Sequence, residues 1–149
     1  MVDNKPADID EFLELYPPPI TVLAHRLREL VTEAQPDAIE RLRSGWRLIG
    51  YDLPKIPGAR AVYFCWIMPE PGHVHVGWQT GTLMKDPKGL LRGAHLKLKK
   101  VRYLTYAPGQ RIAARAVVEF TRDAARLARL TRGERELIAA SRADPASLR

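Results

Sequence analysis

The sequence has almost no cysteine and no long apolar run, and each absence excludes a class of protein. Its 149 residues include one cysteine, Cys65, so the chain can form neither an internal disulfide framework nor a cysteine-rich zinc site. No apolar run approaches the ~20 residues that a membrane helix needs. The first residues contain no apolar segment of the kind that marks a signal peptide. We therefore expect a cytoplasmic protein without a membrane partner.

Length and composition predict one folded domain. A chain of 149 residues lies within the usual size of a single domain, and a hydrophobic fraction of 46% is enough for a sizeable core. We expect the domain to span residues 1–149, with its core over 9–130 and a frayed tail over 142–149.

Charge is distributed unevenly along the chain, whose net charge is +7. Residues 1–40 contain three basic and nine acidic side chains, whereas residues 41–149 contain 21 basic and eight acidic ones. A basic excess attracts nucleotides, phosphorylated metabolites or nucleic acid, but it also keeps a protein in solution. On charge alone, solubility is the simpler explanation.

Helical periodicity marks both ends of the sequence. Asp8 and Glu11 have the spacing of a capping box, and the helix that they begin should end at Pro17–Pro19. Further apolar stripes at helical spacing run over 20–34 and 113–127. A second capping box at residues 131 and 134 predicts a short helix near 132–141.

The middle of the chain has the period of strands. Strands are expected at 46–51, 61–68, 73–78 and 97–106, whereas residues 37–42 are expected to form a short turn. The turn composition of 69–72 predicts that the second and third strands form a hairpin. The fold class that follows is α+β, with an antiparallel sheet of about four strands and amphipathic helices before and after it.

One part of the sequence resembles a known family. The string His73-Val-His-Val-Gly-Trp78, followed by the glycines, leucines and Asp-Pro pair of 81–93, resembles the YdhG-like family of uncharacterised small bacterial proteins. The resemblance covers roughly residues 9–130 and implies an α+β domain of unknown function with an antiparallel sheet. Some members are labelled frataxin-like iron chaperones. This chain departs from the family at 94–96, where Ala-His-Leu replaces a glycine-lysine segment.

A basic segment is the first candidate site. Cations and an aromatic ring follow a loop that contains glycine, and these are residues that grip a phosphate group and stack on a base. The alternative is a solvated edge strand that lysine protects against aggregation. The candidate ligand-binding residues are Lys97, Lys99, Lys100, Arg102, Tyr103, Gly81 and Gly93.

The second candidate is a metal site at His73 and His75. Two histidines at positions i and i+2 of a strand share one face and can chelate a cation, iron included. Glu70 and Asp86 are the nearest acids in sequence. Because hard cations prefer carboxylates, and most acids lie in residues 1–40, histidines on a polar strand face are the simpler interpretation.

The sequence contains no motif that predicts catalysis. Cys65 lies in an apolar strand, where a thiol is ordinarily inert, and no GxSxG or phosphate-binding glycine motif is present. We expect a non-enzymatic module that binds an anionic small molecule or a phosphate-bearing partner, and no cofactor is implied. The alternatives are a metal-handling protein that uses His73 and His75, and a protein-interaction domain or homodimer. Nucleic acid is a further candidate partner that no motif supports.

Overall fold

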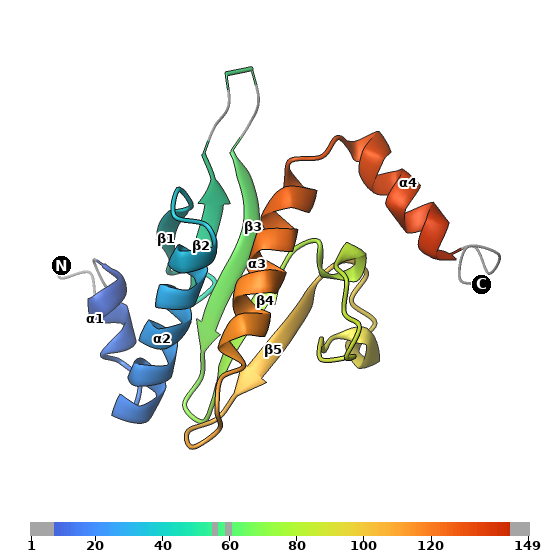
Figure 1. The fold of residues 1–149 in the computed structure, drawn as a ribbon. Coiled ribbons are helices and arrows are strands. Elements are labelled where there is room, and N and C mark those ends of the chain that lie inside the picture. The colour runs from blue at the N-terminus through green and yellow to red at the C-terminus, as the bar shows by residue number, and fades with distance from the viewer. Residues whose placement is uncertain (1–7, 55–56, 59–60, 144–149) are drawn as a thin grey trace.

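Five antiparallel strands form one sheet in the computed structural model, which describes residues 8–54, 57–58 and 61–143. The strands follow each other in chain order across the sheet, so each neighbouring pair is joined by a direct connection. Figure 1 shows α2 and α3 side by side across one face of this sheet. The expected α+β class is therefore confirmed. The strands are β1 (Ile39–Arg43), β2 (Leu48–Leu53), β3 (Val62–Pro69), β4 (Val74–Trp78) and β5 (Arg102–Tyr106).

Prolines separate the first two helices. The carboxylate of Asp8 accepts a hydrogen bond from the backbone N–H of Glu11 at 2.7 Å, which begins α1 (Ile9–Leu13) as the sequence predicted. The next helix, α2 (Pro18–Ala34), has proline at its start, where a helix has no use for the missing N–H. The prolines thus begin α2, whereas α1 ends at Leu13, earlier than the expected end at Pro17–Pro19.

The C-terminal helices also follow the predicted pattern. After α3 (Ala114–Ala128), Thr131 and Glu134 exchange hydrogen bonds of 3.0 and 3.1 Å between side chain and backbone. This capping box begins α4 (Arg132–Ala143). Most of the tail expected to be frayed, 144–149, lies outside the described residues. None of the helices in the described part of the chain is long and apolar enough to cross a membrane.

Strand alternation decides which side chains reach the core. Val74, Val76 and Trp78 are fully buried on the sheet face that α2 and α3 cover. His73 and His75 alternate with them and therefore lie on the opposite, open face. The indole N–H of Trp78 donates to the Thr121 hydroxyl on α3 at 3.1 Å, which satisfies the one polar group that this ring buries.

The prediction of a short turn at 37–42 is wrong, because residues 39–43 form strand β1. Leu42 pairs with Ile49 of β2, and a tight turn at 44–47 joins the two strands. The alternation of this strand is hard to recognise because a carboxylate, Glu40, occupies a core-facing position. Its charge is compensated by Arg28 of α2, at 2.7 Å.

The prediction of a strand at 97–106 is wrong for its first five residues, which form no strand, and is confirmed for 102–106. Two 3-10 turns, η1 (Gly81–Leu83) and η2 (Ala94–Leu96), shape the connection from β4 to β5. Lys97 has a left-handed backbone (φ 56), and the strand begins at Arg102. Arg102 pairs with Trp78, the last residue of β4, so residues before it have no strand to pair with on that side.

Candidate functional site

The lysines of the predicted basic site do not lie along a strand. Lys97, Lys99 and Lys100 are exposed side chains of the loop between η2 and β5. The guanidinium of Arg102 points back into this loop and donates from Nη1 to the carbonyl oxygens of Leu98 and Val101, both at 2.7 Å. Arg102 therefore holds its own loop together.

The two glycines of that site allow close packing between backbone segments. A Cβ atom at Gly81 would lie 2.5 Å from the backbone nitrogen of Arg102. Gly93 has a φ of 128, which other residues rarely adopt, and a Cβ there would lie 3.1 Å from the Val101 carbonyl oxygen. Both glycines thus let the 81–93 loop sit against the start of β5.

The remaining predicted residue, Tyr103, is separated from the lysines. It lies on the open face, where its ring meets the His75 ring edge to face at 5.4 Å. It also lines a small hollow of about 580 Å³ with Arg92 and His95. Neither this hollow nor a larger one beside α2 and α3 is lined by Lys97, Lys99, Lys100 or Arg102.

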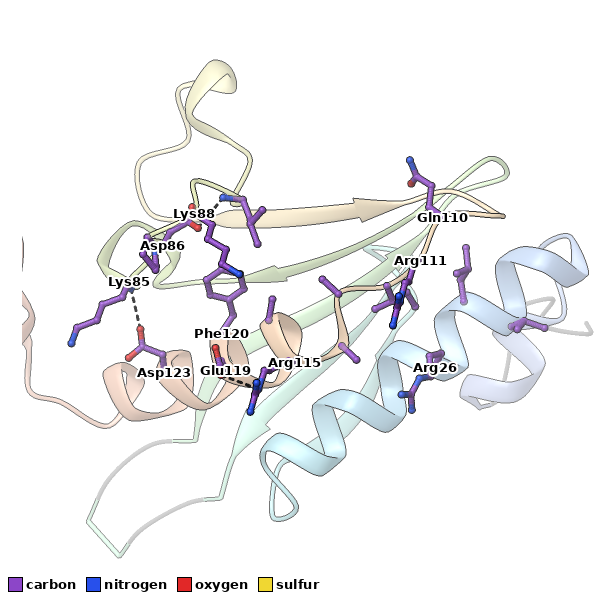
Figure 2. A pocket seen from close by; sticks show the side chains of 18 residues that line it. Arg26, Lys85, Asp86, Lys88, Gln110, Arg111, Arg115, Glu119, Phe120 and Asp123 are labelled. Carbon is purple, nitrogen blue, oxygen red and sulfur yellow. Dashed lines mark hydrogen bonds and ion pairs between the residues drawn. The ribbon is translucent and has the colours of Figure 1, made fainter.

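A larger hollow of about 1130 Å³ lies where α2, α3 and the 85–90 loop meet (Figure 2). Val22 is 68% exposed and Leu90 is 37% exposed, so this hollow presents apolar surface to solvent. A concave surface that combines apolar side chains with charged groups can hold a small molecule that has both kinds of group. Its apolar lining includes Val22, Leu23, Pro87, Leu90, Ile112, Ala116 and Phe120.

The acids that border this hollow are already engaged. Asp86 accepts hydrogen bonds from the backbone of the residues at 90 and 91, at 2.8 and 2.9 Å. Asp123 binds Arg126 at 2.6 Å, and Glu119 pairs with Arg115 at 3.7 Å. Asp123 and Glu119 are thus compensated by neighbouring arginines, whereas Asp86 keeps its negative charge and its oxygens hold the loop backbone.

Two cations of the rim keep their charge available. Among the described residues, neither Lys88 of the loop nor Arg111 of the segment before α3 has a carboxylate partner. Figure 2 shows that the two reach the hollow from different sides, and that Lys85 extends outward. Sequence reasoning did not assign Arg111, because residues near 22, 87 and 111 meet only in the folded chain.

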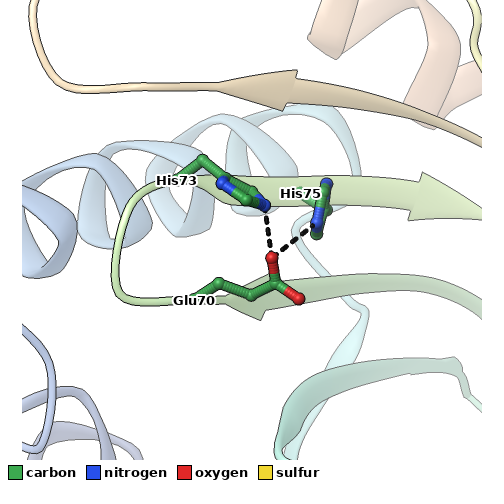
Figure 3. A group of neighbouring side chains, drawn as sticks. All are labelled: Glu70, His73 and His75. Carbon is green, nitrogen blue, oxygen red and sulfur yellow. Dashed lines mark ion pairs between the residues drawn. The ribbon is translucent and has the colours of Figure 1, made fainter.

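The predicted histidine pair gains a third partner in the structure. Oε2 of Glu70 lies within ion-pair distance of Nε2 of both His73 and His75 (Figure 3). The ligand-capable atoms of the three residues all lie within 4.8 Å of one another. Burial lowers the pKa of His75, which outweighs the opposite effect of the Glu70 carboxylate. A neutral imidazole of this kind can donate a lone pair to a cation.

Cys65 behaves as a core residue. Its side chain is fully buried in β3, and burial raises the pKa of the thiol well above its usual range. A protonated thiol without solvent access is a poor nucleophile and a poor metal ligand.

Comparison with known proteins does not assign a family. Protein-family models, curated proteins and solved structures were each compared with the chain, and none of them matches it. A function for this chain therefore has to be argued from its own residues.

Proposed function

We propose that this protein is a non-enzymatic binding module for a small molecule that carries an apolar body and one anionic group, either carboxylate or phosphate. The ligand would lie in the hollow between α2, α3 and the 85–90 loop. The observation that carries this proposal is the pairing of an apolar lining with two cations, Lys88 and Arg111, that lack a carboxylate partner among the described residues.

The apolar body should supply most of the affinity. Each 100 Å² of apolar surface removed from water stabilises a complex by roughly 2.5 kcal/mol. An ion pair with an exposed cation contributes only about 0.2–1 kcal/mol. The two cations would therefore select for a charged end on a ligand that the apolar lining already holds.

This proposal keeps the ligand class that the sequence predicts and moves its site. Lys97 and Lys100 remain the sequence-based alternative, and they have the same charge as the two cations of the hollow. They therefore provide a control that is matched for net charge.

Thermal unfolding with three probes tests the proposal. Decanoate and decyl phosphate combine a tail with an anion and are used below the concentrations at which they form micelles. Decanol has the tail alone and is used below its solubility limit. We expect the midpoint to rise in a graded way with both anions, because a ligand that binds only the native state stabilises it by mass action. Decanol should raise it less, and inorganic phosphate, which lacks a tail, should have almost no effect.

A pair of double variants locates the site. Lys88→Glu with Arg111→Glu should weaken decanoate binding by about tenfold and leave decanol binding unchanged. Lys97→Glu with Lys100→Glu should leave both unchanged. The proposal is wrong if neither anion stabilises the unaltered chain, or if the Lys97 and Lys100 variant loses as much affinity as the other.

We also propose that the chain is a member of the YdhG-like family. The resemblance of residues 73–93 supports this assignment, and the α+β fold that it implies is the one observed.

A further inference from the structure

The β3–β4 hairpin brings three potential metal ligands to one end of the open sheet face. Pro69 of β3 pairs with Val74 of β4, so Glu70 and His73 stand opposite each other in the turn that follows. The backbone N–H of Glu70 donates to the His73 carbonyl oxygen at 2.8 Å and closes this turn. Since side chains alternate along a strand, Glu70, His73 and His75 all lie on the face opposite Val74.

Their spacing suits a small divalent cation. A cation with bonds of about 2.0–2.1 Å holds neighbouring ligand atoms roughly 3.3 Å apart. Nε2 of His75 lies 3.4 Å from Oε2 of Glu70, and the rings of His73 and His75 are 4.7 Å apart at their centroids. Small rotations of these part-exposed side chains would place all three donor atoms around one ion.

Thr105 orients His75, the more buried of the two histidines. Oγ1 of Thr105, on the neighbouring strand β5, lies 2.7 Å from Nδ1 of His75. With the proton on Nδ1, His75 donates to this hydroxyl, and Nε2 presents its lone pair toward Glu70. Ligating histidines are ordinarily fixed in this way by a partner on the other ring nitrogen.

We propose that Glu70, His73 and His75 form a binding site for a divalent transition cation, with Zn²⁺ as the best-suited ion and Thr105 as a positioning residue. Two imidazoles and one carboxylate suit Zn²⁺ better than Mg²⁺ or Ca²⁺, which favour sites made of oxygen ligands. Three protein ligands leave a fourth position for water or for an outside ligand. The site is separate from the hollow between α2 and α3, so either proposal can fail alone.

Titration calorimetry on the full chain without a histidine tag tests this site. We expect one Zn²⁺ per chain with micromolar or tighter affinity, weaker binding of Fe²⁺ under anaerobic conditions, and no heat from Mg²⁺. Bound Co²⁺ should give the visible absorption of a site with imidazole ligands. Sub-stoichiometric Zn²⁺ uptake, or equal uptake of Mg²⁺, would overturn the proposal.

Single variants assign the ligands. Glu70→Gln, His73→Gln and His75→Gln should each weaken Zn²⁺ binding by more than about tenfold, and Thr105→Val by about tenfold. His95→Gln is the matched control, because His95 is exposed and lies outside the group, and it should bind as the unaltered chain does. Thermal unfolding without metal checks that each variant folds. Unchanged affinity in the folded Glu70 and His75 variants contradicts the assignment.

Discussion

The guanidinium of Arg28 holds the carboxylate of Glu40 through two hydrogen bonds, from Nε at 3.0 Å and from Nη2 at 2.7 Å. The hydroxyl of Tyr51 donates to the same carboxylate at 2.5 Å. These contacts join α2 to β1 and β2, so they fasten the edge of the sheet to the helix layer. Burial alone would raise the pKa of Glu40, but the hydrogen bonds from Arg28 and Tyr51 outweigh it and hold the pKa below its usual range.

Glu40→Gln should therefore destabilise the fold in a manner that depends on pH. A carboxylate whose pKa is lower in the folded state adds stability above its unfolded pKa, and this stability is lost as pH falls through the folded value. We expect a loss of about 1–3 kcal/mol at pH 7, because the change removes a charged partner from a half-buried Arg28. Denaturant unfolding from pH 7 to pH 3 measures the loss of stability and its dependence on pH. The free energy of unfolding should decline less steeply toward acid in the variant than in the unaltered protein.

Glu29→Gln is the control for this prediction. Glu29 pairs with Arg26 on the surface of the same helix, and both side chains are largely exposed. The free energy of unfolding of this variant should fall by less than about 1 kcal/mol. Equal losses in the two variants would show that the pair of Arg28 and Glu40 contributes no more than a surface ion pair.

Gly81→Ala should destabilise the protein by about 1–3 kcal/mol, because the added methyl group would meet the backbone of Arg102. Backbone atoms cannot move aside as a side-chain tip can. Gly45→Ala provides the comparison, since a Cβ at Gly45 has no neighbour within 4 Å. If denaturant unfolding gives both variants the same stability, the close packing of this loop against β5 does not require glycine at position 81.

Cys65 should not react with a thiol reagent while the protein is folded. Full burial denies the reagent access, and the raised pKa keeps the thiol protonated at neutral pH. Absorbance during reaction with a disulfide reagent measures this, with denatured protein as the reference. Rapid labelling of the native chain would place the thiol outside the core.

Some of the fold was predictable because it depends on neighbours in sequence. The capping box at Thr131 and Glu134 acts over three residues, and the alternation from His73 to Trp78 is a property of one strand. Both patterns identify their elements because hydrogen bonding and side-chain direction repeat over short distances.

The errors arise where a distant residue decides the outcome. From the sequence, Glu40 is expected at the surface. Its core-facing position is explained only by the contact with Arg28, twelve residues away, which neutralises its charge. The sequence of 97–101 predicts a strand. The structure forms a loop there because β4 ends at Trp78, which pairs with Arg102 and leaves earlier residues without a partner strand on that side. In each case the missing information is a contact between elements.

The sequence alone determined the helices at both ends, the hairpin at its centre and the shared face of His73 and His75, because each follows from backbone periodicity. The tertiary structure alone decided which cations border a hollow and which acid meets the histidines. Arg111 and Lys88 come from separate segments, and Glu70 reaches His75 across a hairpin. A binding site needs side chains brought together in space, and only the packing of helices on the sheet and the pairing of strands do that.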